Sequence, residues 1–291
     1  MNLGQKAYTI GAGWFGKVRV YYSQQFKRKV VEKIVGPNFI RVRDGNRLRL
    51  TTLIQNYHNS ELMLKKETAF MYLMKLAKLP YCVEILGFSS NPFRIVMEYC
   101  EGGDLRKILD TYNVPVQDKM IMIIQILACI KSIHSYRVIH GDLKCANIFL
   151  ANKYVPGDTT SIKIKIGDFG VSEVGGNLVH SGTPGFVAPE VFKYGGSFES
   201  DIYSIGKVML EIMTQLPVGI ISQINTYNIN SIKDRLPKFL NVSDFYNLVI
   251  PCLNLDPKKR PTAERLYNLY YTVFKLIIVA AAIKQYKKWF L

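Results

Sequence analysis

The sequence predicts an α+β fold of two lobes, on three observations. Short runs rich in β-branched and aromatic residues alternate with turns over the first hundred residues, and one segment at 61–76 has helical spacing. From about residue 104 the apolar spacing becomes mostly helical, as at 119–136. A glycine pair in EGGDL (101–105) lies between the two patterns and indicates a hinge. We therefore expect one domain (1–291): a small antiparallel β-rich N-lobe with one key helix (1–100), a larger mainly α-helical C-lobe (101–265), and a C-terminal helix with a basic and aromatic tail (266–291).

Composition and charge limit the classes of protein to consider. Of the 291 residues, 48% are hydrophobic and 21% are charged, which is typical of a globular protein. The formal charge of +16 favours anionic partners such as a nucleotide, an acidic protein or a membrane surface, with a solvated basic surface as the alternative. Basic charge alone provides no device for reading bases, so a nucleic-acid-binding module is disfavoured.

The cysteines argue against a disulfide-rich or metal-binding domain. They are odd in number, scattered, and without a CxxC or Cys/His spacing (Cys82, Cys100, Cys129, Cys145, Cys252). The first 16 residues contain no apolar core of signal-peptide length. These features predict free thiols in a reducing compartment, so we expect an intracellular, cytoplasmic protein.

The first strand-like segment carries a glycine motif. IGAGWFGKV (10–18) has the pattern GxGxxGxV, and glycines allow a tight turn and close approach of the backbone to phosphates. The next residues, RVYYS, form another β-like run rather than the helix of a dinucleotide-binding fingerprint. The segment therefore predicts a β-hairpin that lies over phosphates.

The next elements place a lysine on a strand and a carboxylate on a helix. Lys33 has apolar neighbours in the strand-like RKVVEKIV (28–35), where a lone lysine is most often a solvated charge. The helical segment at 61–76 carries four residues on one face: Met63, Glu67, Phe70 and Met74. The last strand-like run of this half, FRIVMEYC (93–100), leads into the glycine pair.

Two loops of the second half concentrate polar groups. In VIHGDLKCANIFL (138–150), Asp142, Lys144 and Asn147 lie between apolar runs that anchor the loop in the core. The strand-like SIKIKIGDFG (161–170) ends in an Asp-Phe-Gly triplet. The carboxylate of Asp168 therefore emerges at the end of a strand, where a metal could be bound.

Together these segments resemble a eukaryotic-type protein kinase. The resemblance rests on nine motifs in the same order along nearly the whole chain: GAGWFGKV, VVEK, ETAFMYL, VMEYCEGGDL, HGDLKCAN, DFG, GTPGFVAPE, DIYSIG and DPKKRP. It implies a bilobal kinase fold that uses ATP and Mg²⁺ to phosphorylate a protein substrate. A pseudokinase scaffold and a kinase for a small molecule or lipid are the alternatives.

The resemblance implies a role for each polar residue in these loops. Asp142 would accept or orient the substrate hydroxyl, and Lys144 would neutralise charge near the γ-phosphate. Lys33 would bind the α- and β-phosphates and be held by Glu67, with Glu61 as the second candidate. The Mg²⁺ ligands would be Asn147 and Asp168.

It also implies the lining of a nucleotide site. The phosphates would lie under the glycine loop, represented by Gly11, Ala12, Gly13 and Gly16. The adenine would lie between a roof of Val18 and Val31 and a floor of Phe149, with Met97 at the back. Its hydrogen bonds would come from the backbone of Glu98 and Cys100, and Asp104 would reach the ribose or a basic substrate residue.

Further residues resemble those of Ser/Thr kinases rather than Tyr kinases. These are Lys144 after Asp142, and the segment GTPGFVAPE (182–190), in which Thr183 would hydrogen-bond the catalytic Asp and Lys. The resemblance also implies two structural arrangements: an ion pair between Glu190 and Arg260, and hydrogen bonds from the catalytic-loop backbone to Asp201.

Two residues depart from the family pattern. Gly141 stands where the family usually has an arginine that receives the phosphate of the activation loop. We therefore hypothesise that activity does not require phosphorylation of this loop. The alternative is that Gly141 is a tolerated variation and that another basic residue takes the place of the usual arginine. The second is Glu32 beside Lys33, which we expect to be exposed and harmless, because strand neighbours point to opposite faces.

Two segments fall outside the motifs. Residues 40–50 alternate aliphatic residues with arginine around a turn, which predicts a hairpin with one all-arginine face. That face favours an acidic partner or is simply solvated (Arg41, Arg43, Arg47, Arg49).

The apolar run within 266–291 is too short to span a bilayer. A last helix packed on the C-lobe is favoured there over contact of the tail with a membrane surface.

Overall fold

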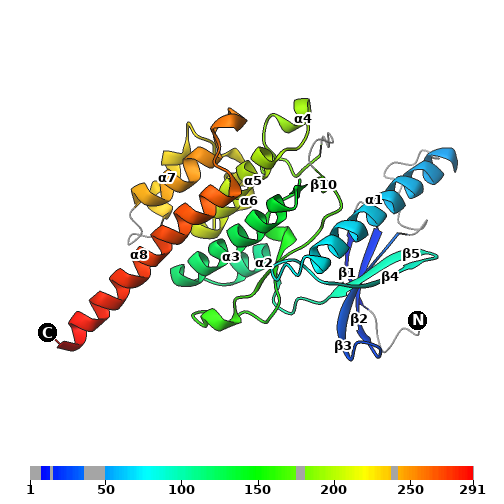
Figure 1. Cartoon of the computed structure of the whole chain (residues 1–291), viewed down its shortest axis with the longest axis horizontal. Helices are drawn as coiled ribbons and strands as arrows, with labels where there is room; N and C mark the ends of the chain where they lie inside the picture. The colour runs from blue at the N-terminus through cyan, green and yellow to red at the C-terminus, as the bar shows by residue number, and fades with distance from the viewer. Residues whose placement is uncertain (1–7, 14–15, 36–49, 175–180, 237–241, 291) are drawn as a thin grey trace.

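The structure confirms the predicted α+β fold of two lobes. Residues 8–13, 16–35, 50–174, 181–236 and 242–290 are described in this computed structural model. The large sheet and one long helix lie at one end of the molecule, and the other helices form the opposite end (Figure 1).

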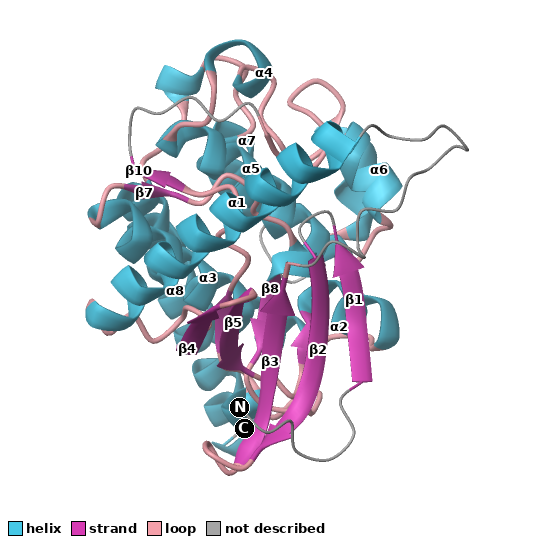
Figure 2. Cartoon of the chain, turned by 90° about the vertical axis from the view of Figure 1, so that its right-hand side faces the viewer, coloured by secondary structure: helices cyan, strands magenta, loops and turns pink. Residues whose placement is uncertain are grey.

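The N-lobe contains a five-stranded antiparallel sheet in the order β1-β2-β3-β5-β4 (Figure 2). Its strands are β1 (Tyr8–Gly13), β2 (Gly16–Ser23), β3 (Arg28–Ile34), β4 (Ile85–Ser90) and β5 (Phe93–Glu98). β1 and β2 form the hairpin that the glycine motif predicts, with Gly13 opposite Gly16. β3 is the central strand, and Lys33 lies opposite Ile95 of β5.

Helix α1 (Leu50–Leu76) is longer than the segment predicted at 61–76. Its buried face includes Leu64, Glu67, Met71 and Met74, which recur at intervals of three to four residues. Met63, which the prediction placed on this face, is only partly buried. The apolar members join the core that continues into the C-lobe, so this face fixes which way Glu67 points.

The C-lobe is built around helices α3 (Val116–Ser135) and α5 (Phe198–Thr214); half of the residues of α3 and most of those of α5 are buried. The other helices are α2 (Leu105–Thr111), α4 (Val191–Tyr194), α6 (Val218–Gln223), α7 (Val242–Cys252) and α8 (Ala263–Phe290). Short 3₁₀ turns occur at Cys145–Asn147, Thr159–Ser161, Ile229–Arg235 and Pro257–Lys259. Helix α8 packs against α3 through its first turns, and its far end projects from the body (Figure 1).

Two small sheets hold the catalytic-type loop in place. One has the order β6-β8-β9, and the other pairs β7 with β10. Their strands are β6 (Gly103–Asp104), β7 (Val138–Ile139), β8 (Ile148–Leu150), β9 (Ile164–Ile166) and β10 (Glu173–Val174). The loop at 140–147 therefore runs between two paired strands, β7 and β8, and Asp168 follows β9 by two residues.

Buried charges brace the C-lobe beneath this loop as expected. Arg260 Nη2 donates to Glu190 Oε2 at 2.9 Å, and the Arg260 side chain is fully buried. Asp201 on α5 accepts hydrogen bonds from the backbone N–H groups of His140, at 2.8 Å, and Gly141, at 2.9 Å. The loop backbone is therefore tied to the central helix of the lobe.

The structure does not test the contacts predicted for the arginine-rich segment at 40–50 and for the C-terminal tail. The arginines at 41, 43, 47 and 49 lie outside the described residues, although Leu50, expected to end their hairpin, begins α1. Contact of the C-terminal tail with a membrane surface stays a prediction. Within the described part of the chain, no helix combines the length and apolar character needed to cross a bilayer.

The prediction that Glu32 is exposed was wrong. Its side chain does point away from Lys33, but only 1% of it is accessible. Arg19 lies directly opposite on β2, with Nε 3.1 Å from Glu32 Oε2, and Arg94 of β5 places Nη1 3.2 Å from Oε1. Strand alternation determines the face of a side chain, whereas cross-strand neighbours determine whether it is covered.

We expect Glu32→Ala to lower the free energy of unfolding by about 2–3 kcal/mol, because two guanidinium groups lose a charged acceptor. Urea unfolding followed by circular dichroism measures this. Glu61→Ala is the matched control, since its ion pair with Lys65 lies on the surface of α1 and contributes about 0.3–0.5 kcal/mol. Equal losses for the two variants would contradict a structural role for Glu32.

Candidate active site

A cavity of about 390 Å³ is lined by residues of both lobes. Its volume lies within the range of about 300–1,000 Å³ that is usual for small-molecule sites. Its apolar lining includes four residues that the sequence predicted there: Val18, Val31, Met97 and Phe149. Its polar lining includes Lys33, Glu67, Asn147 and Asp168.

Lys33 is the charged centre of this cavity. Its Nζ donates to Glu67 Oε2 at 2.7 Å and to Asp168 Oδ1 at 3.0 Å. Glu61, the second candidate for this role, pairs instead with Lys65 on its own helix. Strand β3, helix α1 and the segment after β9 thus meet through one ammonium group.

The pKa shifts of these groups follow from burial and from their pairing. Burial disfavours the charged form of Lys33, but Glu67 and Asp168 outweigh it, so the pKa of the ammonium is raised. Burial raises the pKa of Glu67, a shift that Lys33 opposes. Burial also works against ionised Asp168, yet Lys33 prevails and the pKa of that carboxyl is lowered. The ammonium and the Asp168 carboxylate are therefore both charged at neutral pH.

Asp142 is held by three side chains in the loop between β7 and β8. Lys144 Nζ donates to Asp142 Oδ2 at 2.7 Å, and Asn147 Nδ2 donates to the same oxygen at 3.0 Å. Thr183 Oγ1 donates to Asp142 Oδ1 at 2.6 Å and accepts from Lys144 Nζ at 2.6 Å. Asp142 and Lys144 do not line the cavity themselves; they are joined to it through Asn147, which does.

The backbone around Asp168 adopts a conformation unusual for a residue with a side chain. Its φ is 64°, in the left-handed region that aspartate tolerates better than most residues. The next residue, Phe169, is fully buried and packs near the His140 ring, with the ring centroids 5.0 Å apart. A Cβ at Gly167 would lie 2.9 Å from Val83 Cγ2. These contacts hold the Asp168 carboxylate toward Lys33.

The remaining predicted residues lie on the β1–β2 hairpin and at the connection between the lobes. Gly11, Ala12, Gly13 and Gly16 form the β1–β2 hairpin that carries the lining residue Val18. Glu98 and Cys100 line the cavity at the connection between the lobes. Asp104 caps α2 by accepting from Lys107 N at 3.0 Å and also pairs with Lys107 Nζ at 3.0 Å, so its carboxylate already has partners.

Sequence reasoning missed six lining residues. They are Ile10, Val83, Tyr99, Gly103, Lys107 and Gly167. Five are within three residues of a predicted site residue, so proximity was the available signal for them. Val83 had no such signal, because only folding brings it next to Phe149 and Asp168.

The residues present fit Mg²⁺ in combination with a nucleotide. Among the described residues there is no cluster of three or more His, Cys, Asp or Glu side chains that could hold a metal alone. Asp168 and Asn147 would supply oxygen ligands, and Mg²⁺ typically takes one or two carboxylates and completes its shell with phosphates and water. The Asp168 side chain is 35% exposed, so it can be reached from the cavity.

Comparison with known proteins agrees with this geometry. The model of the protein kinase domain family matches residues 5–272. The chain is 33% identical over 224 residues to the cell cycle serine/threonine-protein kinase CDC5/MSD2 of Saccharomyces cerevisiae. The aligned part covers 72% of this chain and 30% of that protein.

Two further relatives are similar over more of the chain. Serine/threonine-protein kinase Nek6 of Oryza sativa is 31% identical over 273 residues, 84% of this chain and 47% of its own length. Serine/threonine-protein kinase atg1 of Dictyostelium discoideum is 27% identical over 276 residues, 89% of this chain and 37% of its own length. The chain thus spans less than half of the length of these relatives.

We expect Lys33→Met to lower the free energy of unfolding by about 3–5 kcal/mol at pH 8, because it leaves the Glu67 carboxylate buried without its cation. Burial raises the pKa of Glu67, and Lys33 no longer opposes that shift. The folded variant then binds a proton at pH values where the unfolded chain has lost it, so its stability falls as the pH rises. The loss should therefore be smaller at pH 5 than at pH 8.

Urea unfolding at the two pH values measures this difference. The control is Lys33→Met/Glu67→Gln, which removes both charges and should recover much of the loss at pH 8. A loss that is the same at both pH values in Lys33→Met would contradict this account of the buried pair.

Proposed function

We propose that this chain, which belongs to the protein kinase family, transfers the γ-phosphoryl group of ATP to a serine or threonine hydroxyl of a protein substrate. One observation carries the proposal. The Asp142 carboxylate is fixed by Lys144, Asn147 and Thr183, and Asn147 connects it to the cavity that contains the Lys33–Asp168 pair. Phosphoryl transfer depends on such positioning and charge stabilisation.

The nucleotide would lie in the cavity between the lobes. The base would pack between Val18 and Val31 on one side and Phe149 on the other. Because the Glu98 N–H already donates to the Glu84 carbonyl, at 2.9 Å, the base would use the Glu98 carbonyl and the Cys100 N–H. The phosphates would lie under the β1–β2 hairpin and reach Lys33, whose raised pKa keeps it cationic.

The reacting groups would then be arranged for in-line displacement. Asp142 would accept a hydrogen bond from the substrate hydroxyl, aim its oxygen at the γ-phosphorus, and take the proton. The new P–O bond forms as the bond to the β-phosphate oxygen breaks, and Lys144 would neutralise charge on the transferring group. Mg²⁺, held by Asn147 and Asp168, would supply charge neutralisation of the phosphate oxygens.

The segment GTPGFVAPE (182–190) supports a protein as the substrate. At one end of this segment, Thr183 hydrogen-bonds to Asp142. At the other end, Glu190 forms an ion pair with the buried Arg260. A segment anchored at both ends beside the carboxylate suits the docking of an extended peptide. This disfavours a small-molecule or lipid kinase, and the complete set of polar residues disfavours a pseudokinase.

The proposal is tested by incubating the purified chain with γ-labelled ATP, Mg²⁺ and a library of Ser/Thr- and Tyr-containing peptides. We expect transfer to Ser or Thr, and a loss of at least a hundredfold in Asp142→Asn, which keeps the shape of the side chain without its basic carboxylate. Asp110→Asn is the control, because the Asp110 side chain on α2 is exposed. Full activity of Asp142→Asn, or transfer to tyrosine alone, would overturn the proposal.

We further propose that activity does not depend on phosphorylation of the loop between Gly170 and Ala188. Gly141 offers no side chain to receive a phosphate there. Phosphatase treatment should therefore change the rate by less than about twofold, compared with a mock-treated sample whose phosphate content is followed by mass spectrometry. A hundredfold loss of activity would refute this.

A further inference from the structure

The start of the activation segment, defined here as residues 168–190, is linked to helix α1 by an ion pair between Lys66 and Glu173. The two residues are 107 positions apart in the chain. The Glu173 side chain is 11% exposed and that of Lys66 is 39% exposed. The pair is therefore partly desolvated, and such pairs stabilise more than fully exposed ones.

Glu173 is held at this place by backbone pairing. It belongs to β10 and lies opposite Ile139 of β7, the strand that leads into the loop of Asp142. The preceding Ser172 donates its hydroxyl to the His140 carbonyl at 2.9 Å. The carboxylate of Glu173 is thus a fixed point of the C-lobe rather than the end of a free loop.

Lys66 is the residue before Glu67 on α1. Consecutive helical residues are rotated by about 100°, so the two side chains reach different neighbours from the same turn. Glu67 binds Lys33 in the cavity, and Lys66 binds Glu173 on the activation segment. A movement of this turn away from both the C-lobe and strand β3 would break the two ion pairs together.

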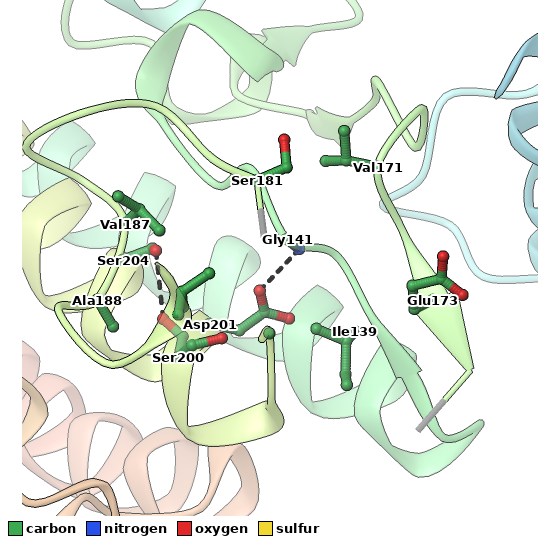
Figure 3. Close-up of a pocket in the computed structure, with 12 residues that line it drawn as sticks. Ile139, Gly141, Val171, Glu173, Ser181, Val187, Ala188, Ser200, Asp201 and Ser204 are labelled. Atoms are coloured by element: carbon green, nitrogen blue, oxygen red, sulfur yellow. Dashed lines mark hydrogen bonds between the residues drawn. The ribbon is translucent and has the colours of Figure 1, made fainter. Parts of the chain in front are cut away.

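Glu173 borders a small cavity next to Gly141. Gly141 also borders it, together with Ser181, Asp201 and apolar side chains (Figure 3). None of the described residues that line it is basic. Gly141 has a φ of 82°, and a Cβ there would lie 3.1 Å from the Val171 carbonyl oxygen, so a side chain at this position would be strained. The cation that pairs with Glu173 among the described residues comes from α1 instead.

We propose that Lys66 and Glu173 are positioning residues, whose ion pair holds α1 and the activation segment together and keeps Glu67 on Lys33 without a phosphate. This rests on the proposed kinase function. Glu173 supplies the negative charge that a phosphorylated residue would otherwise bring to the activation segment, and Lys66 on α1 is the cation that pairs with it.

The test compares Lys66→Ala, Glu173→Ala and the charge swap Lys66→Glu/Glu173→Lys with a matched control. Lys65→Ala is that control, because Lys65 is the neighbouring lysine and pairs with Glu61 within α1, at 2.7 Å. We expect about a tenfold fall in kcat/KM with a raised KM for ATP in each single variant, since Lys33 is then less often correctly held. The swap should recover to within about threefold of wild type, and the control should stay within twofold.

Hydrogen exchange separates failure of this proposal from failure of the proposed function. Backbone amides of β10 and of α1 around residue 66 should exchange faster in Lys66→Ala and in Glu173→Ala than in wild type and Lys65→Ala, whether or not phosphate is transferred. Unchanged exchange, single variants as active as the control, or a swap no better than the single variants would overturn the role of the pair. A wild-type chain without transfer activity but with the expected exchange pattern would refute the kinase function alone.

Discussion

The structure depends on one requirement, that the buried ammonium of Lys33 be shared between two carboxylates. Neither Glu67 nor Lys33 would be stable there alone, because burying an unpaired charge costs several kcal/mol. The pairing therefore forces strand β3, helix α1 and the segment after β9 into one arrangement. The same arrangement leaves the Asp168 carboxylate partly exposed and ionised, which is the state needed to bind a cation.

A second set of buried groups gives the catalytic-type loop its rigidity. Asp201 accepts the backbone N–H groups of His140 and Gly141, and Arg260 is buried against Glu190. These bonds lie beneath Asp142, and Thr183 completes its surroundings from the segment that they support. Positioning within a fraction of an ångström matters for phosphoryl transfer, because a displacement of about 1 Å can cost about a hundredfold in rate.

The fold class and the contacts of Lys33, Asp142 and Thr183 were within reach of the sequence, because ordered motifs constrain residues that must meet around one ligand. Other features depended on packing between distant segments. The burial of Glu32 required the register that places Arg19 opposite it, and the start of α1 at Leu50 ran against an alternating pattern that suggested a strand. The Lys66–Glu173 pair joins residues of ordinary types that no motif marks, so only the three-dimensional arrangement brings it to notice.

The ion pair between Lys66 and Glu173 has a consequence for control of the protein. A carboxylate carries one negative charge at neutral pH, and it cannot be removed as a phosphate can. The apolar face of α1, with Leu64, Met71 and Met74 in the core, must provide most of the free energy that holds the helix, and the ion pair then selects its orientation. On this proposal the link is made without phosphorylation, and regulation of this chain would act on another feature, such as access to the cavity.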